Sequence, residues 1–413
     1  MKLILGFSIP LLFGNLFQQF YSMVDTMIVG RVLGTGPLAA VGSTGSITFL
    51  IIGFCLGLCS GFAIPVAQRF GSRDYKELRR FIGNAVWLCV GFGIVLTVLT
   101  VIFCRNILEL MGTPADIIDD AYAYLVIIFA GIPATFLYNM LAGIQRAIGD
   151  SRTPVVILVI ASIINIVLDI VLVVFIPMGV AGAAVATVAS QLIGGVICLL
   201  YVSKHYEVLK MTREDFKINV PCIKRLLSMG LPMALQTSIT AIGSVILQAS
   251  VNSLGSTVVA SITAGSKLYM FFACAYDAMG VTMSTYSGQN IGARKIDRIG
   301  QGVKACNIVG IIYSVLALLI IVFLGKWMLL LFVDAGETAI INSAYWYLVC
   351  SGLFMIPLTF VNVLRLTIQG MGYSRLALFA GVFEMIARGV FALCLVPVGG
   401  FTAVCLANPA AWV

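Results

Sequence analysis

Charge is the property that this sequence has least of. Asp, Glu, Lys and Arg make up only 10% of its 413 residues, whereas about 25% is usual in a soluble domain. Hydrophobic residues make up 61% of the chain. They form recurring runs of about 20 or more residues, each long enough to cross a hydrocarbon core of about 30 Å. The composition excludes a soluble globular protein and predicts an all-α polytopic membrane protein.

Histidine is almost missing, since His205 is the only one. The eleven cysteines are scattered through apolar runs without a CxxC pair, and only Cys55 and Cys59 are spaced to share a helix face. This pattern argues against a zinc site and favours cysteines that act as small hydrophobic side chains. The sequence also lacks a P-loop and the common hydrolase and dinucleotide-binding motifs. We therefore expect no enzyme, no cofactor and no nucleotide-driven pump.

The apolar runs predict eleven membrane spans and the beginning of a twelfth. We place the eleven at residues 3–29, 40–67, 81–103, 122–145, 154–176, 180–201, 226–252, 258–288, 303–325, 344–366 and 376–397. The twelfth begins near Thr402, and we expect it to be truncated at Val413.

Basic residues are unevenly divided between the two ends of these spans. About 20 of the 25 Lys and Arg fall on one side, at Lys2 and in segments 69–80, 146–152, 204–225, 294–304 and 365–375. The opposite side holds only Arg31, Arg105 and Lys326, while Lys267 and Arg388 remain inside the membrane. By the positive-inside rule, the basic side and the N-terminus face the cytoplasm of a bacterium, across its plasma membrane. The net charge of +8 thus reports topology and not a nucleic-acid partner.

The chain repeats itself at an interval of about 220 residues. "AQRFGSR" at 67–73 matches "GQNIGAR" at 288–294, "AYAYL" at 121–125 matches "AYWYL" at 344–348, and "QRAIGDSR" at 145–152 matches "QGMGYSR" at 369–375. Six spans per copy give both copies the same orientation, so the pseudo-two-fold axis runs along the membrane normal, and substrate sites lie in or between such halves. We expect an N-lobe at 1–201, a cytoplasmic linker at 202–225 and a C-lobe at 226–413 around a central cleft. We expect a monomer, because this unit encloses its own cleft.

Only four acidic side chains fall well inside the predicted spans, at Asp25, Asp169, Asp277 and Glu384. Such residues usually face a bundle interior or a water-filled cavity. Counting 1.5 Å per residue places Asp25 about 9 Å, Asp169 about 12 Å and Thr187 about 10 Å below the outer ends of their spans. Asn165 lies one turn from Asp169 on the same face. These oxygens would hold Na⁺ or a proton equally well, and local capping by the two acids is the alternative interpretation.

Further polar side chains are candidates for a substrate cavity: Gln18, Tyr21, Tyr138, Gln191, Gln236, Gln248 and Asp277. Tyr138 and Gln191 could instead make simple interhelical hydrogen bonds, and the ladder on span 7 that contains Gln236 and Gln248 could face neighbouring helices. Pro10 should bend the first span, as a moving element or as a static kink.

The two halves differ in their charged groups. Asn165 aligns with Arg388 and Asp169 with Ala392, so the ion-like cluster is not duplicated. Glu384 and Arg388, four residues apart, are expected to pair with each other. Asp277 and Lys267 lie too far apart on one helix for a direct pair, and either could contact substrate or act in gating.

Four features point to one family: the internal repeat, the "VDTMIVG" of span 1, the paired "QRFGSR" and "QNIGAR" loops, and "NIVLD" on span 5. In these features the chain resembles the MATE (multidrug and toxic compound extrusion) family, and its DinF-like bacterial branch in particular. The resemblance implies two six-helix lobes around a cleft and export of bulky cationic or amphipathic compounds in exchange for H⁺ or Na⁺. It also implies a cation site at Asp25, Asn165, Asp169 and Thr187, a cavity-lining Gln18 and a bending Pro10.

Two other functions are compatible with many membrane spans. A flippase for lipid-linked oligosaccharides, from the same superfamily, would need a cavity rich in Arg or Lys to hold a diphosphate. Large polar surfaces outside the membrane would favour a receptor or scaffold without transport activity, whereas the short loops here argue against one.

Overall fold

The computed structural model describes residues 1–413, apart from the side chain of Thr35, and every regular element among these residues is a helix. Within this part of the chain, nine helices are long and apolar enough to span a membrane, and the number rises to eleven if each of two bent helix pairs is one span. The predicted all-α membrane architecture is confirmed.

The first copy of the repeat, here called the N-half, contains helices α1 to α9. Their bounds are α1 Lys2–Ile28, α2 Thr35–Ser43, α3 Gly45–Gly71, α4 Tyr75–Ile102, α5 Cys104–Leu110, α6 Ile118–Ala130, α7 Ile132–Ala147, α8 Arg152–Asp169 and α9 Val180–His205. Short π-helical segments continue α1 (η1, Val29–Leu33) and α8 (η2, Ile170–Phe175). Helices α6 and α7 meet at 46° and together form one bent span.

The second copy, the C-half, contains helices α10 to α16. Their bounds are α10 Val220–Asn252, α11 Ser256–Gly292, α12 Ile296–Leu329, α13 Thr338–Leu353, α14 Met355–Gly370, α15 Ser374–Val390 and α16 Val396–Ala411. The π-helical segment η4 (Phe391–Leu395) joins α15 to α16, and α13 and α14 form a span bent by 52°. The bend and the π-helical segment thus recur at matching places in both halves.

The last helix is interrupted at Gly400, whose φ of +54° and ψ of −134° are not helical. Beyond this residue the chain turns back along α15, because Asn408 accepts a hydrogen bond from Arg388 Nε at 3.1 Å. Glycine permits this backbone conformation because it has no Cβ. The segment after Gly400 is therefore a separate helical segment from α15, and it begins close to Thr402, where the sequence predicts the start of a twelfth span.

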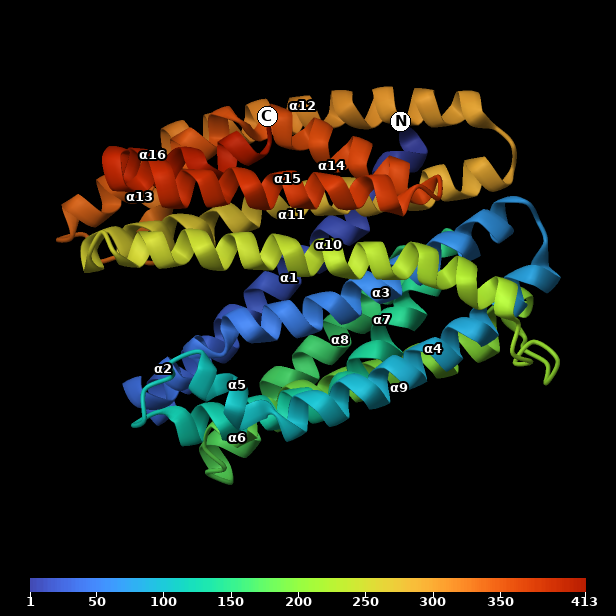
Figure 1. Ribbon diagram of the computed structural model, residues 1–413, viewed down its shortest axis with the longest axis horizontal. Helices are drawn as coiled ribbons and strands as arrows, with labels where there is room; N and C mark the ends of the chain where they lie inside the picture. The colour runs from blue at the N-terminus through green and yellow to red at the C-terminus, as the bar shows by residue number, and fades with distance from the viewer.

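Figure 1 shows the two halves as two layers of roughly parallel helices. They meet along α3 and α10, where glycines allow the backbones to approach closely. A Cβ added to Gly57 would lie 2.6 Å from the Ala234 Cα, and one added to Gly61 would lie 2.5 Å from the Gly230 Cα. Such small residues let membrane helices pack backbone to backbone.

The first helix of each half begins in the hydrophobic core of the other half. Ile4 of α1 is buried in the C-half core with Leu268 and Phe272, and Ser8 Oγ lies 2.8 Å from Thr282 Oγ1. Reciprocally, Cys222 and Leu226 of α10 are buried in the N-half core. Helix α1 then crosses between the layers and ends against the N-half, where Val29 packs with Val173 and Ala183.

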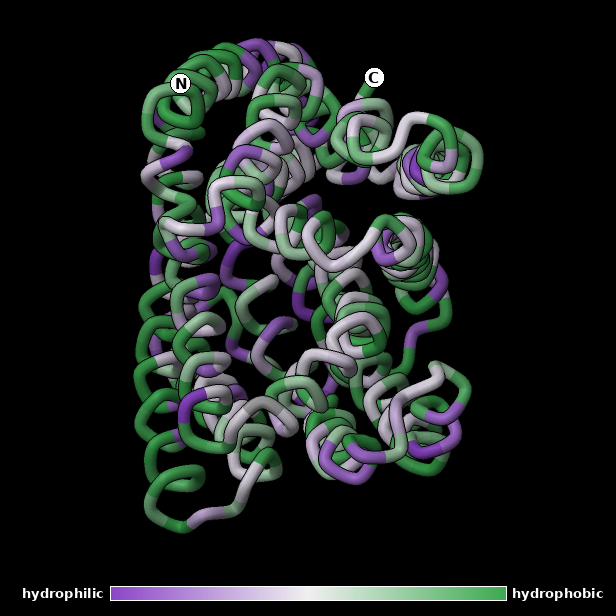
Figure 2. The backbone as a smooth tube through the Cα atoms, turned by 90° about the vertical axis from the view of Figure 1, so that its left-hand side faces the viewer, coloured by the Kyte–Doolittle hydropathy of each residue, from purple (hydrophilic) through white to green (hydrophobic). Residues whose placement is uncertain are grey.

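The surface between the two ends is apolar, as lipid contact requires. On α12, for example, Phe323 and Trp327 are each 73% exposed. Viewed along the helices in Figure 2, apolar residues dominate the outer helices of both layers. Since a soluble protein rarely exposes such a continuous apolar surface, this belt is the part that faces the hydrocarbon.

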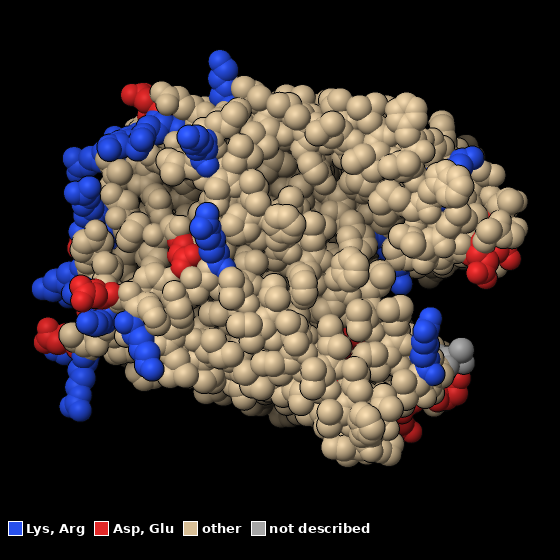
Figure 3. Space-filling model, turned by 180° about the vertical axis from the view of Figure 1, so that it is seen from behind, with Lys and Arg blue, Asp and Glu red and all other residues tan. Residues whose placement is uncertain are grey.

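Lys and Arg gather at one end of the molecule, on the left in Figure 3. The N-terminus lies at this basic end, with the loops that follow α3, α7, α9 and α11. One residue was placed wrongly by sequence. Arg365, assigned to a loop of the basic side, lies within α14 and pairs with Glu384 at 2.7 Å. The apolar run alone could not show that the helix continues past it.

Candidate functional site

The two halves are in contact at the basic end and separated at the other. At the basic end, Gln68 Nε2 donates to the Gly370 carbonyl at 3.1 Å, and Gln289 Nε2 donates to the Ala147 carbonyl at 2.8 Å. Each bond crosses from one half to the other. At the opposite end, a cleft opens between the halves, visible on the right in Figure 3.

Glycines bring these contacts together. A Cβ on Gly71 would lie 1.9 Å from the Gln289 carbonyl oxygen, and one on Gly292 would lie 1.8 Å from that of Gln68. No larger residue fits there without displacing the backbone of the other half. The two copies of the Q-x-x-G-[AS]-R loop thus close the basic end by contacting each other.

Asp25 of α1 and Asp169 at the end of α8 meet inside the N-half. Their carboxyl groups lie within hydrogen-bonding reach of each other. Asp169 is fully buried, and Asn165, one turn earlier on α8, is 2% exposed. The sequence placed Asp25 and Asp169 at nearly one depth and Asn165 on the same helix face as Asp169, and the structure gathers these three groups into one cluster.

The cluster is short of hydrogen-bond partners. Five of its buried atoms have none among the described residues: Asp25 Oδ1, both side-chain polar atoms of Asn165 and both carboxylate oxygens of Asp169. Buried polar groups are almost always satisfied in native proteins, so each such atom requires an explanation. Two carboxyl groups in contact are also costly when both are ionised. A bound cation, or a proton shared between the carboxyls, removes the charge repulsion and gives the unpartnered carboxylate oxygens a partner.

The donor set fits a small hard cation. Carboxylate and amide oxygens are the ligands that such an ion prefers. The described residues contain no group of three or more His, Cys, Asp or Glu placed to hold a metal, so a cation here would also use neutral oxygens. Thr187 on α9 is the predicted fourth group. Its hydroxyl donates to the Ala183 carbonyl at 3.0 Å, which leaves its oxygen free to accept.

Two tyrosines adjoin the cluster. Tyr21 lies one turn before Asp25, beside Gln18 and close to both carboxyls. Tyr124 of α6 approaches the same two carboxyls and was missed by sequence reasoning. Tyr124 belongs to the "AYAYL" motif, which in the sequence alone indicates only the internal repeat.

π-helical segments lie beside the charged groups. η2 begins directly after Asp169, η1 begins four residues after Asp25, and η4 begins three residues after Arg388. A π-turn widens the helix locally and is frequent at functional sites. Pro10, by contrast, lies within a continuous α1.

The C-half contains a separate cavity of about 470 Å³. Its polar lining includes Gln236, Thr240, Ser244, Asp277, Arg365, Glu384 and Arg388. Glu384 pairs with Arg365 at 2.7 Å and with Arg388 at 3.5 Å, which confirms the expected Glu384–Arg388 pair. Asp277 is exposed to the cavity. With two arginines and two acids, this cavity carries no excess of either charge.

Other residues predicted to line a substrate cavity lie outside the lining of this C-half cavity. The Tyr138 hydroxyl donates to the Pro154 carbonyl at 3.2 Å, and Gln191 accepts from Thr135 Oγ1 at 2.7 Å, so both make interhelical hydrogen bonds. Gln248 donates to Asn252 on its own helix, at 2.9 Å. Gln18 is exposed on α1, as is Lys267 on α11. Of the predicted cavity residues, Gln236 and Asp277 line the C-half cavity, and Tyr21 adjoins the acidic cluster.

Comparison with known proteins places this arrangement in a family. The MatE family pattern matches the chain twice, at residues 10–171 and 232–393, once in each half. A probable multidrug resistance protein of Bacillus subtilis, YoeA, is 32% identical over 340 residues, covering 80% of this chain and 73% of its own. The DNA damage-inducible protein F of Escherichia coli is 28% identical, covering 76% and 69% of the two chains.

Solved structures share the fold over the whole chain. An outward-facing conformation of a multidrug resistance MATE family transporter superimposes with a TM-score of 0.93 at 22% identity, covering 100% of this chain and 92% of that one. A transporter of the wider superfamily from Pyrococcus furiosus superimposes with a TM-score of 0.92, also at 22% identity, covering 100% and 93%. The chain belongs to the MATE family of multidrug efflux transporters, whose members are membrane transporters and not enzymes.

Proposed function

We propose that this protein is a secondary active antiporter that exports organic cations or other amphipathic drugs in exchange for H⁺ or Na⁺. The observation that supports it most directly is the contact between Asp25 and Asp169, surrounded by buried polar atoms without partners. Such a cluster is stable when it holds a cation or a proton and strained when it does not. That difference is what an exchanger needs, because the ion must be released as well as bound.

Helix α1 connects this site with both halves of the molecule. Asp25 lies near one end of α1, while Ser8 and Ile4 near the other end contact the C-half. A change in the occupancy of Asp25 therefore acts on a helix that contacts both sides of the cleft. An ion that binds one arrangement of α1 more tightly than another shifts the equilibrium between them.

The substrate is proposed to enter the cleft and the C-half cavity. Asp277 is the acid exposed there, while Glu384 is neutralised by two arginines. An organic cation would therefore be attracted chiefly to Asp277. The balanced charge of this cavity does not favour a lipid diphosphate, which a flippase would have to hold. We further propose that the basic end with the N-terminus faces the cytoplasm and that the protein works as a monomer.

The test is efflux from proteoliposomes loaded with a fluorescent organic cation, with Na⁺ and pH gradients imposed separately. Wild type should respond to one of the gradients, and Asp25→Asn should lose at least about tenfold in rate, since it removes a charge needed for ion binding. Asp116→Asn, in an exposed loop, makes the same chemical change as a control. Full efflux by Asp25→Asn would contradict the assignment of the coupling site.

A further inference from the structure

Two cavities flank the contact between the Q-x-x-G-[AS]-R loops at the basic end. One, of about 720 Å³, is lined by the start of α1 and is here called the α1-side cavity. The other, of about 770 Å³, is lined by the start of α10 and is called the α10-side cavity. Neither belongs to the acidic cluster or to the C-half cavity.

The α1-side cavity has a strong excess of positive charge. Its lining contains five cations and one acid, Asp150. The cations are Lys2, Arg73 and Arg152 from the N-half and Lys295 and Arg298 from the C-half. None of the five has a carboxylate within 4.0 Å in the part of the chain that the structure describes. Asp150 is already hydrogen-bonded to the Arg152 and Thr153 backbone N–H groups and to the Tyr206 hydroxyl.

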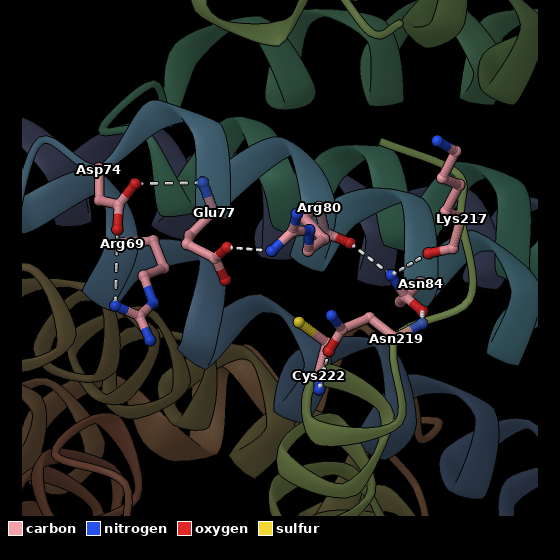
Figure 4. A network of polar contacts seen from close by, with 8 residues as sticks. All are labelled: Arg69, Asp74, Glu77, Arg80, Asn84, Lys217, Asn219 and Cys222. Carbon is pink, nitrogen blue, oxygen red and sulfur yellow. Dashed lines mark hydrogen bonds and ion pairs between the residues drawn. The ribbon is translucent and has the colours of Figure 1, made fainter. Parts of the chain in front are cut away.

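The α10-side cavity shows the same imbalance. Arg69 and Arg80 line it from the N-half, Arg225 and Arg294 from the C-half, and Glu77 is the acid. Figure 4 shows that Glu77 binds Arg80 and that Arg69 reaches toward Asp74. Arg225 and Arg294 are exposed, and neither makes an ion pair with any described residue.

The two cavities are counterparts in the internal repeat. Gly71, Arg73 and Gln289 line the first, and their repeat equivalents Gly292, Arg294 and Gln68 line the second. Each cavity therefore combines cations of both halves around the same loop contact. A ligand that neutralises these cations would bridge the N-half and the C-half on both sides of the closed end.

The chemistry of the lining points to phosphate. The guanidinium group matches phosphate oxygens with paired hydrogen bonds, and arginines predominate in both cavities. Cations at the cytoplasmic surface of a membrane also meet anionic headgroups there. Both volumes lie in the usual range for ligand pockets, roughly 300–1,000 Å³. We propose that these two cavities bind phosphate groups, of anionic lipid headgroups or of soluble polyphosphate, and that the bound groups hold the basic end closed.

The experiment compares the protein in nanodiscs of phosphatidylcholine alone, in nanodiscs with phosphatidylglycerol, and in phosphatidylcholine nanodiscs with added pyrophosphate. The readouts are the unfolding midpoint and, by native mass spectrometry, the number of retained anionic lipids. A ligand of the folded state raises the midpoint. A rise with phosphatidylglycerol alone identifies a lipid headgroup, and a rise with pyrophosphate identifies a soluble ligand. A rise with neither overturns the proposal.

Three double variants locate the effect. Arg152→Gln with Arg298→Gln changes the α1-side cavity, and Arg225→Gln with Arg294→Gln changes the α10-side cavity. Each should weaken binding to its own cavity about tenfold or more, because charge-assisted hydrogen bonds are lost. Lys304→Gln with Arg375→Gln removes the same charge from the basic end outside both cavities. An equal loss in this control would show a diffuse surface effect and overturn the proposal.

Mass spectrometry of the wild type keeps the test independent of how well the variants fold. Two anionic lipids, retained through delipidation while phosphatidylcholine is lost, would support paired sites. Equal retention of phosphatidylcholine and of the anionic lipid would count against paired sites.

Discussion

At the scale of single residues, the N-half cluster combines groups that a stable core would avoid. Asp25 and Asp169 are in contact, and the amide of Asn165 beside them has no partner among the described side chains and backbone groups. In a protein selected for stability alone, apolar groups of the same volume would be preferable. Under the proposed function, the exchanged H⁺ or Na⁺ relieves this unfavourable contact when it is bound.

Replacing one acid should therefore stabilise the protein while abolishing its transport. In Na⁺-free buffer at high pH, Asp169→Asn removes a repulsion that reaches about 4 kcal/mol for two charges about 4 Å apart at an effective dielectric constant of about 20. Its unfolding midpoint should exceed that of wild type there. The difference should shrink on acidification, because protonation relieves the repulsion in wild type. A midpoint below that of wild type at high pH would mean that the two acids are not in repulsive contact.

A second residue-level prediction concerns Asp150, which lies outside the spans. Burial alone would raise the pKa of its carboxyl group, but hydrogen bonds from Thr153, Tyr206 and Arg152 outweigh burial and lower that pKa below its usual 3.8. A carboxyl with a lowered pKa stabilises the fold above the pKa of the unfolded chain, and the contribution disappears as pH falls through the lowered value.

Tyr206→Phe removes one of these hydrogen bonds. At pH 7 it should cost about 1 kcal/mol, less than a fully buried charge-assisted bond because the pair is partly exposed. The deficit should begin to narrow as the pH falls below 3.8, the pKa in the unfolded chain, and should disappear below the lowered pKa of the folded protein, where Asp150 becomes protonated. Unfolding midpoints between pH 7 and the acid limit of stability would show this convergence, and a constant deficit would exclude a role for the Asp150 charge.

At the scale of helices and loops, closure of the basic end depends on glycine. Gly71→Ala places a methyl group within 1.9 Å of the Gln289 carbonyl oxygen, where no flexible side chain can give way. We expect this variant, and Gly292→Ala with it, to populate states in which the basic end is open and the cleft is narrower. Gly300→Ala is the control, since a Cβ there meets nothing within 4 Å.

Labelling of Ser244→Cys, in the C-half cavity, by a thiol reagent applied from the cleft side reports this shift. The test needs a background in which the exposed Cys394 is replaced. Slower labelling with either loop variant, but not with Gly300→Ala, is the expected outcome. Unchanged labelling in folded Gly71→Ala protein would show that the contact does not set the conformation.

The helices also show what the sequence could and could not predict. Runs of apolar residues predicted the spans because the hydrocarbon core demands a minimum length of such residues. They could not predict the π-helical segments beside Asp25 and Asp169, since an apolar run meets the same length requirement whether the helix is α or locally π. Arg365 was misplaced for a related reason: a charged residue near the end of an apolar run marks a loop or a buried ion pair equally well. Only its contact with Glu384 distinguishes them.

At the scale of the whole molecule, the halves share a fold but differ in their charges. The N-half contains two acids in contact, whereas the C-half cavity balances two arginines against Glu384 and Asp277. Alignment of the repeats predicted this difference, because Asn165 and Asp169 correspond to Arg388 and Ala392. The linker is hydrogen-bonded to α4 of the N-half, which its polar composition did not indicate. Its Phe216 carbonyl accepts from Trp87 Nε1 at 2.8 Å, and Asn84 accepts from the Asn219 N–H at 2.8 Å.

Cutting the linker should leave the molecule assembled. Lys217 is exposed, and a protease site inserted after it would separate the halves covalently. Because Ile4 is buried in the core of the C-half and Leu226 in that of the N-half, we expect the two fragments to co-purify through a size-exclusion column. Each fragment expressed alone should aggregate. Dissociation of the cut protein into two folded fragments would contradict this account of the interface.

The exchange of first helices bears on how such a chain arose. Two copies of one six-helix protein, each inserting its first helix into the other, would make a domain-swapped homodimer with an isologous interface. The paired bonds of Gln68 and Gln289, and the mutual contacts of Gly71 and Gly292, have the form of such an interface. Fusion of two such copies would fix the swap within a single polypeptide and would allow each half to change its charges separately. The closed end, with its two paired cavities, thus has the symmetry expected of a dimer of identical copies, whereas the acidic cluster of the N-half has no counterpart in the C-half.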